Sequence, residues 1–136
     1  MFNNILIPVD MAHTEKATDM VAAAKQVAAK DAKFVLATIV HSVPAMAELS
    51  VSQEYFDMAA EEARNELKKI AKDENLDAVL EMRVGQPAND ILAIAADKKV
   101  DLIIVGSHRP GFQDYLLGST ASRVVRHAQC PVLVMR

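Results

Sequence analysis

The chain has 136 residues, 51% of them hydrophobic but only 4% aromatic, and a formal net charge of −3. Its length fits one domain over residues 1–136, with a core built from aliphatic side chains and methionine. Interspersed charges exclude the basic stripe of a nucleic-acid-binding protein, no apolar run reaches the ~18 residues that cross a membrane, and the N-terminus lacks the pattern of a signal peptide, which together favour the cytoplasm.

The first part of the chain alternates strand and helix patterns. A short apolar run, closed by a proline and an aspartate, predicts a buried strand over Asn4–Val9. Apolar positions that recur every 3.6 residues follow it and predict a helix capped by Thr14. Lys33–Val40 is rich in β-branched residues and predicts a second strand. A strand–helix–strand unit of this kind is typical of a parallel sheet.

A long amphipathic helix is expected next, after a loop. It begins at Ser50 or Ser52, both suitable N-cap residues, and reaches about Ala71. The segment that follows, Ala78–Val84, alternates apolar and polar side chains, so we expect a half-exposed strand at an edge of the sheet. The helix residues expected on the buried face are Tyr55, Met58, Ala59, Ala63, Leu67 and Ile70.

The remaining residues predict two further helices and two further strands. A turn at 85–87 leads into a helix through residues 91–95, and Val100–Val105 is a continuous apolar strand apart from its second residue. Ser119–Ala128 is the last predicted helix and Val132–Met135 the last strand. The repeated strand–helix order indicates an open, Rossmann-like α/β sheet of parallel strands. Such a sheet binds ligands beyond the carboxyl ends of its strands, where the strand order reverses.

Small and polar residues follow two of these strands. Pro8, Val9 and Asp10 end the first strand, and Gly106 and Ser107 end the fourth. If these strands are neighbours, the residues meet in one crevice, where Gly106 lets the backbone approach a ligand closely. Asp10 is then a candidate acceptor for a ribose hydroxyl or a ligand of a metal ion. The alternative is a polar turn residue or a helix N-cap.

Three further sets of residues are candidates for binding a nucleotide. Gly118-Ser119-Thr120 opens a helix, where unpaired N–H groups and the macrodipole favour a phosphate, although a plain N-cap uses the same groups. In the loop after the fourth strand, the guanidinium of Arg109 matches phosphate oxygens and His108 can assist, unless both are simply solvated. Ile39 ends the second strand, where its main chain can read the edge of a base while its side chain belongs to the core.

Signatures of common enzymes are absent from the sequence. It contains no GxxxxGKS/T loop, no GxGxxG after the first strand and no GxSxG elbow, and its four histidines lack metal-binding spacing. The single cysteine, Cys130, precedes the last strand in an apolar setting, so we expect it to be buried and unreactive. Because no catalytic base is identified, any turnover is expected to be slow.

The last strand is short, apolar and placed at the end of the chain. If Pro131–Arg136 lies at an edge of the sheet, its free N–H and C=O groups favour pairing with a second copy of the chain. A two-fold homodimer is the simplest arrangement. The alternative is an edge that the chain covers itself.

The whole chain resembles the universal stress protein family. The resemblance rests on ILIPVD near the N-terminus, on VGQPANDILAIAADKKVDLIIVGSHRP in the middle, and on LLGSTASRVVRHAQCPVLVMR at the end. It implies a five-stranded parallel sheet of order 3-2-1-4-5 with two helices on each face. It also implies a homodimer formed through the last strand, 131–136.

The family's nucleotide motif is present with a departure in its middle. Many members bind ATP through G-2x-G-9x-G-(S/T), in which Gly106 matches the first glycine and Gly118 and Ser119 match the closing pair. Arg109 stands where the second glycine belongs, and eight residues instead of nine separate it from Gly118. This variant resembles the subgroup labelled F and G, some members of which bind ATP, with Arg109 supplying charge where other members use N–H groups.

The resemblance implies an ATP-binding regulatory protein of the stress response, acting through nucleotide-dependent interactions with a second copy or a partner. It places Asp10 near the ribose and the main chain of Ile39 at the adenine, with Val9 and Val105 beside them; Mg²⁺ can accompany ATP, although no carboxylate cluster supports it. Two alternatives are an interaction module that binds no nucleotide, and a weak ATPase or autophosphorylating protein. The expected nucleotide contacts are Pro8, Val9, Asp10, Ile39, Val105, Gly106, Ser107, His108, Arg109, Gly118, Ser119 and Thr120.

Overall fold

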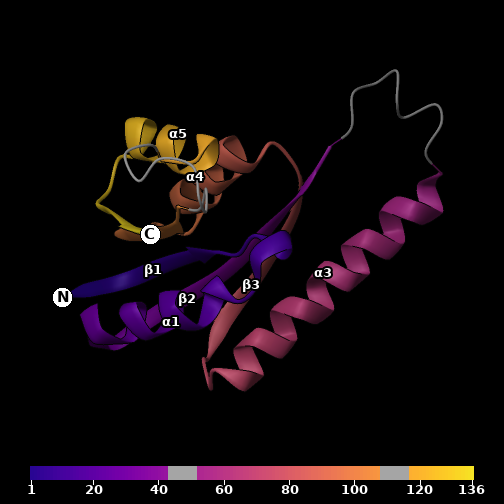
Figure 1. Ribbon diagram of the computed structural model, residues 1–136. Helices are drawn as coiled ribbons and strands as arrows, with labels where there is room; N and C mark the ends of the chain where they lie inside the picture. Colours follow the sequence, from indigo (N-terminus) through magenta and orange to yellow (C-terminus); the bar gives the residue numbers. More distant parts are fainter. Residues whose placement is uncertain (43–51, 108–116) are drawn as a thin grey trace.

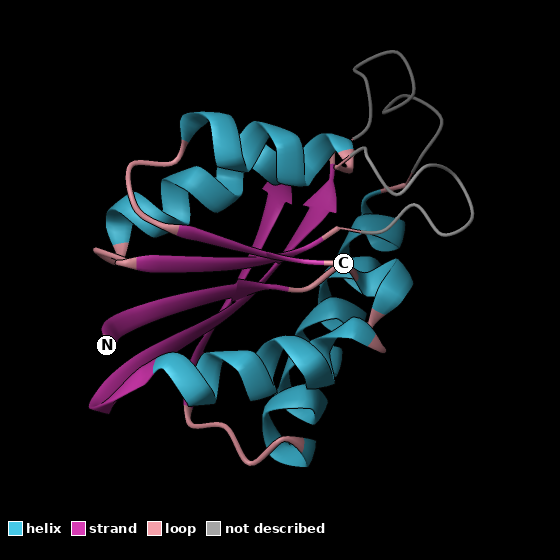
Figure 2. Cartoon of the chain, turned by 60° about the vertical axis from the view of Figure 1, so that its left-hand side comes forward, coloured by secondary structure: helices cyan, strands magenta, loops and turns pink. Residues whose placement is uncertain are grey.

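The computed structural model describes residues 1–42, 52–107 and 117–136. These residues form a five-stranded parallel sheet of order β3-β2-β1-β4-β5, which confirms the predicted order and the α/β class. Helices α4 and α5 cover one face, and α1 and α3 the other (Figure 1, Figure 2). The strands are β1 (Phe2–Pro8), β2 (Ala28–His41), β3 (Ala78–Gly85), β4 (Leu102–Gly106) and β5 (Val132–Met135). The helices are α1 (Lys16–Val27), α3 (Gln53–Asp73), α4 (Pro87–Asp97), α5 (Ser119–His127) and the short 3₁₀ helix η1 (Met11–His13).

The core lies in two layers, one on each face of the sheet. Successive residues of a strand point to opposite faces, so Ile5 and Ile7 pack with α1 and α3 while Leu6 packs with α4 and α5. All three side chains are fully buried. A strand that is buried on both faces is apolar at every position, which explains the continuous apolar run that predicted β1. Burial of each such side chain stabilises the fold by roughly 1.5–3 kcal/mol.

The first long helix begins later than the sequence predicts. The carboxylate of Asp10 caps η1 by accepting the N–H of Ala12 at 2.9 Å, and α1 starts only at Lys16. No side chain caps α1, so the predicted cap by Thr14 is wrong. Thr14 instead contributes its main-chain oxygen, which accepts the N–H of Ala17 at 3.0 Å.

Helix α3 confirms one of its two predicted starts and corrects its predicted buried face. Ser52 caps the helix, since its hydroxyl accepts the N–H of Tyr55 at 3.2 Å, whereas Ser50 lies outside the described residues. The side chains of Tyr55 and Met58 are wrongly predicted, because these residues are 62% and 63% exposed. The first turns of α3 reach past the strands (Figure 1), so they have no sheet to pack against. The residues of α3 that are buried are Ala60, Ala63, Leu67 and Ile70.

Two helices end in turns that return the chain to the sheet. After α3, Asn75 adopts a left-handed conformation (φ 49°), and the N–H of Leu76 donates to the C=O of Ala71 at 2.8 Å. After α4, Lys99 does the same (φ 53°), and the next N–H, of Val100, donates five residues back at 2.9 Å. These are Schellman turns, which satisfy main-chain oxygens at the helix ends. Of the described helices, none is long and apolar enough to cross a membrane.

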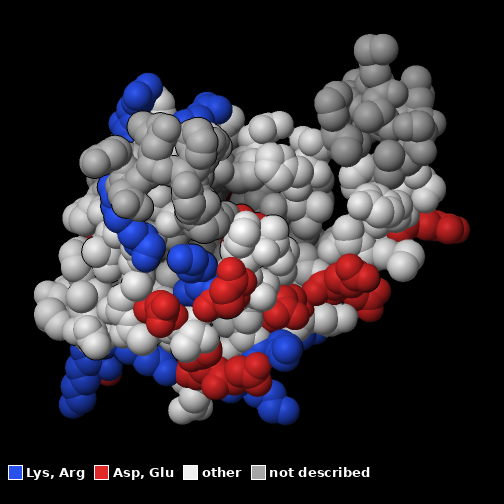
Figure 3. Space-filling model, viewed as in Figure 1, with Lys and Arg blue, Asp and Glu red and all other residues white. Residues whose placement is uncertain are grey.

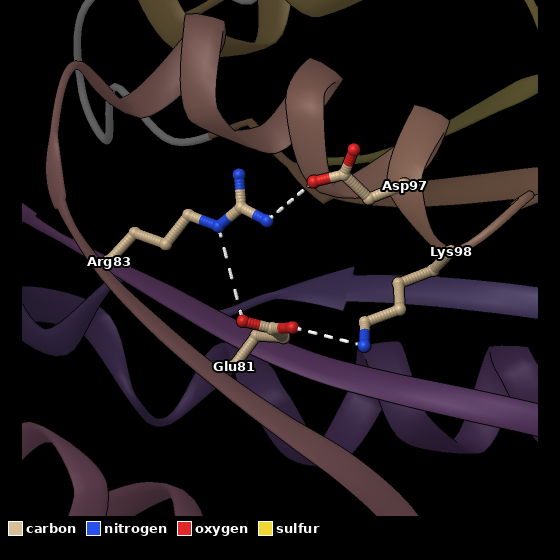
Figure 4. A network of polar contacts seen from close by, with 4 residues as sticks. All are labelled: Glu81, Arg83, Asp97 and Lys98. Carbon is tan, nitrogen blue, oxygen red and sulfur yellow. Dashed lines mark hydrogen bonds and ion pairs between the residues drawn. The ribbon is translucent and has the colours of Figure 1, made fainter.

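Strand β3 lies at an edge of the sheet, as its alternating pattern predicts, and ion pairs connect it to α4 (Figure 4). Arg83 donates to Asp97 at 2.8 Å, a hydrogen bond that raises the pKa of the guanidinium. Glu81 lies 3.2 Å from Lys98 and 3.9 Å from Arg83. Partly exposed pairs of this kind contribute about 0–1 kcal/mol each, so the network orients β3 against α4 more than it stabilises the fold.

Asp101 joins the amino ends of β1 and β4. Its carboxylate accepts the N–H of Asn3 at 2.9 Å and that of Asn4 at 2.8 Å, and its own N–H donates to the C=O of Asn4. Desolvation by burial opposes ionisation of this carboxyl, but the N–H donors outweigh it and lower the pKa of Asp101 below its ordinary value. The two strands are therefore tied together at the end of the sheet away from the carboxyl edge.

Candidate functional site

The sheet divides between β1 and β4 at its carboxyl edge. The two strands pair only where Ile5–Leu6 faces Leu102–Ile103. Beyond these residues, β1 pairs with β2 alone as far as Pro8, and β4 pairs with β5 alone as far as Gly106. The strand order reverses here, because β2 and β3 follow β1 on one side of the sheet and β5 follows β4 on the other. An open α/β sheet binds its ligands at such a point.

A cavity of about 840 Å³ opens at this division. Its volume is in the range of pockets that hold small ligands. Ser107 is buried beside the cavity but does not line it, and His108 and Arg109 lie outside the described residues. The predicted site residues that line the cavity are Pro8, Val9, Asp10, Ile39, Val105, Gly106, Gly118, Ser119 and Thr120.

The end of β2 turns main-chain groups toward this cavity. The N–H of Val9 donates to the C=O of Ala37 at 2.7 Å, so the main-chain groups of Ala37 point toward β1. The direction alternates along a strand, and those of Ile39 therefore point the same way. Ser42 lies an odd number of residues from Ile39, so its main-chain groups point to the other side, and its N–H donates to the C=O of Gly85 in β3. Because β1 has ended, Ile39 presents its N–H and C=O to the cavity that it lines.

The N-terminus of α5 forms another part of the cavity wall. Gly118 is the N-cap, and no side chain caps the helix within the part of the chain that the structure describes. The N–H of Gly118 donates to Oγ of Ser107 at 3.3 Å, and the N–H of Ser107 donates to the C=O of Met135 at 2.7 Å. Ser107 thus fixes the start of α5 against β5. The first-turn N–H groups, at Ser119 and Thr120, have no intrahelical partners and lie where an anion is favoured.

The two motif glycines leave room in the cavity. A Cβ added to Gly118 meets no atom within 4 Å, and one added to Gly106 meets only Sδ of Met20, at 3.5 Å. Neither glycine adopts a left-handed conformation. The backbone itself therefore tolerates a side chain at either position, and what the absent side chains provide is space beside the helix N-terminus.

Sequence reasoning missed the charged wall that α3 contributes. Glu62 and Glu66 line the cavity one helical turn apart, beside Ala59 and Ala63. Figure 3 shows acidic side chains following α3 across this face of the molecule. The signal was available, because each glutamate follows a small inner-face residue by three positions and so projects from the same side of the helix. The other missed polar residues of the lining are His13, Thr14, Lys16 and His41.

The described residues offer no ready-made metal site. Among them, no three His, Cys, Asp or Glu side chains are grouped so that they can hold a metal ion. Cys130, predicted to be buried, is partly buried, and it packs away from the cavity, against the core layer of α4 and α5. Desolvation, assisted by the charge of Asp101, raises the pKa of its thiol.

Known proteins match this chain over its full length. A family model described as the Universal stress protein family matches residues 1–136. Universal stress protein G of Escherichia coli O157:H7 is 30% identical over 145 aligned positions that cover all of both chains. Universal stress protein MJ0531 of Methanocaldococcus jannaschii is 38% identical over 95 residues, which are 69% of this chain and 56% of that protein. The chain thus matches little more than half the length of the archaeal relative.

Solved structures share the fold. Protein MJ0577 of Methanocaldococcus jannaschii superposes with a TM-score of 0.80 at 30% identity, over 99% of this chain and 96% of that one. Two more distant structures, at 24% and 18% identity, are complexes of universal stress proteins, one with cAMP and one, from Archaeoglobus fulgidus, with dAMP. With a family model over every residue and a relative matched from end to end, the chain belongs to the universal stress protein family.

Proposed function

We propose that this chain is an ATP-binding regulatory protein of the stress response, and that residues 1–136 act as one nucleotide-binding domain. The observation that carries the proposal is the cavity at the division of the sheet, which collects a carboxylate, a helix N-terminus with no side-chain cap among the described residues, and main-chain groups of a strand end that pair with no other described residue. These are groups that suit a ribose, phosphates and a base respectively. Nucleotide binding then changes the affinity for a second copy or a partner protein.

The triphosphate lies at the α5 side of the cavity. There the N–H groups of the first helical turn and the space beside the two motif glycines accept anionic oxygens. The opposite wall carries Glu62 and Glu66, whose charge repels phosphates. Arg109 follows β4 in the sequence and supplies a cationic group to the phosphates, with His108 assisting. With this distribution of charge, the nucleotide binds with its phosphates toward α5 and away from Glu62 and Glu66.

The nucleoside lies between the ends of β1 and β2. Asp10 lines the cavity and accepts a ribose hydroxyl, while Ile39 directs its N–H and C=O to the edge of the base. Val9 and Val105 contribute apolar surface for the sugar and the base. The complexes of distant universal stress proteins with cAMP and dAMP support an adenine nucleotide as the class of ligand, since the same fold binds one in each of them.

Regulation, rather than catalysis, is the proposed role, and the cytoplasm the proposed location. Mg²⁺ accompanies the triphosphate, and because the described residues supply no cluster of three ligands, phosphate oxygens and water would complete its coordination. Strand β5 is an edge strand of four residues that pairs with β4 on one side. We assign its other side to β5 of a second copy, which gives a two-fold homodimer through 131–136.

The experiment is calorimetric titration of nucleotide-stripped protein with ATP, ADP and AMP, with and without Mg²⁺. We expect affinity to fall from ATP to AMP, because each lost phosphate removes contacts at α5. Gly118→Val should fold, since its Cβ meets no atom, and should weaken ATP binding at least about tenfold by filling the phosphate path. Gln129→Val places the same side chain at an exposed position beyond the other end of α5 and serves as the control, which should bind ATP as the wild type does.

Two outcomes would change the assignment. If wild-type protein binds none of the three nucleotides, the chain is an interaction module of the same fold. If ATP incubation adds mass to the intact protein or releases ADP steadily, the chain is a slow ATPase or an autophosphorylating protein. Unchanged ATP affinity in a folded Gly118→Val variant would instead place the phosphates elsewhere.

A further inference from the structure

A buried hydroxyl lies directly behind the base-binding end of β2. Thr38 is only 1% exposed, and its hydroxyl donates to the C=O of Val9 at 2.9 Å. Val9 is itself 5% exposed and lines the cavity with its neighbour Asp10. The hydrogen bond thus connects a side chain of β2 to the segment where β1 has ended and the chain turns into η1.

The ladder between β1 and β2 stops at this bond. The two strands pair in parallel until the N–H of Val9 reaches the C=O of Ala37 at 2.7 Å. In a continued parallel ladder, the N–H of Ile39 would donate next to the C=O of Val9. No such bond forms between these two described residues, and the hydroxyl of Thr38 occupies that C=O instead. The N–H of Ile39 is left facing the cavity.

We propose that Thr38 is a positioning residue: its hydroxyl holds the C=O of Val9 and thereby keeps the N–H of Ile39 available to a bound base. The proposal rests on the proposed function, in which this N–H meets adenine. Adenine presents an acceptor, N1, beside a donor, its amino group, and this pattern matches the N–H and C=O that Ile39 turns to one side. Hypoxanthine presents the reverse pattern, so the strand end selects ATP over ITP.

Because Val9 is buried, its C=O depends on the hydroxyl of Thr38 for a hydrogen bond. A buried C=O is nearly always hydrogen-bonded, because an unpaired one loses its interaction with water without compensation. In Thr38→Val the side chain keeps its shape but loses the donor. In a continued ladder the C=O of Val9 would accept the N–H of Ile39, so we expect the variant to form this one additional hydrogen bond between the strands. That N–H is then no longer available to a bound base.

The first test compares three variants by titration with ATP and ITP. Thr38→Val should bind ATP about tenfold more weakly, the loss of roughly one hydrogen bond, and its preference for ATP over ITP should shrink by a similar factor. Thr38→Ser retains the hydroxyl and should restore both values. Thr18→Val, which removes a hydroxyl bonded to Glu74 at 2.7 Å outside the cavity lining, should leave both unchanged. Thermal melting of each variant separates a loss of stability from a loss of selectivity.

The second test needs no nucleotide. In the free wild-type protein, the amide of Ile39 should exchange with solvent faster than that of Ala37, and in Thr38→Val its exchange should slow about tenfold or more. A wild-type amide already protected, or equal ATP/ITP preference in Thr38→Val and wild type, would overturn the role of Thr38. If no nucleotide binds the wild type, the proposed function fails, while the amide exchange still decides what Thr38 does.

Discussion

Gly85 is predicted to contribute to stability by leaving room for the side chain of Asp90. It is the last residue of β3, and the carboxylate of Asp90, in α4, occupies the place where its Cβ would stand. That carboxylate accepts the N–H of Gln86 at 2.8 Å and so satisfies a donor at the start of α4. Gly85→Ala must therefore displace the carboxylate and break this hydrogen bond.

The magnitude follows from two opposing terms. Losing a side-chain cap at a helix N-terminus costs about 0.5–2 kcal/mol, and alanine lowers the entropy of the unfolded chain by about 0.4–1 kcal/mol relative to glycine. Because Gly85 is not in a left-handed conformation, no backbone strain is added. Gly85→Ala should thus lower the free energy of unfolding by about 0.5 kcal/mol, and Tm by about 2 °C in a chain of this length.

Urea unfolding followed by circular dichroism measures this effect in two backgrounds. In the wild type, Gly85→Ala should move the midpoint to lower urea with an unchanged slope. In an Asp90→Ala background the carboxylate is gone, so the same substitution should become neutral or stabilising. A double-mutant cycle isolates this coupling. Equal destabilisation in both backgrounds would refute the reasoning, because the obstacle would then be something other than the Asp90 carboxylate.

Two further predictions concern residues at the amino edge of the sheet. Lys99→Gly should stabilise the protein by about 0.5–1 kcal/mol, since a left-handed residue favours glycine, whereas Lys98→Gly, at φ −92°, should destabilise it; chemical unfolding compares the pair. Asp101→Asn should lower the free energy of unfolding at pH 7 by about 1 kcal/mol. Because folding lowers the pKa of Asp101, this stabilisation is present above the ordinary value near 3.8 and is lost as pH falls through the folded pKa, so wild type and variant should converge in acid.

The strand order was accessible from the sequence in part because each strand has its own pattern. A fully buried strand such as β1 is apolar at every position, while the edge strand β3 alternates; these patterns separate inner from edge strands, and the full order came from the family resemblance. Element ends were less accessible. Thr14 is a suitable cap by residue type, but Asp10 starts the 3₁₀ helix η1 first and delays α1. Capping propensity does not say which of two candidates the chain uses.

The part of the candidate site at the strand ends was predicted from the sequence, whereas the wall formed by α3 was missed. Residues such as Asp10 and Gly106 follow strands directly, so a parallel sheet brings them together by its topology alone. The position of α3 depends on how far a long helix extends past the strands that it covers. That is why Tyr55 and Met58 are exposed although they share the helical period of the core, and why Glu62 was missed as a cavity residue.

The groups proposed to recognise the nucleotide are mostly main-chain groups, so the proposed site depends little on the motif residue that departs from the family pattern. The N–H and C=O of Ile39 and the first N–H groups of α5 are set by where strands and helices end. If the proposed function holds, we expect variation in 108–116 to change the phosphate contacts more than the recognition of the base. In its proposed role, the buried Thr38 acts on the base through the backbone, because its hydroxyl lies where the ladder between β1 and β2 stops.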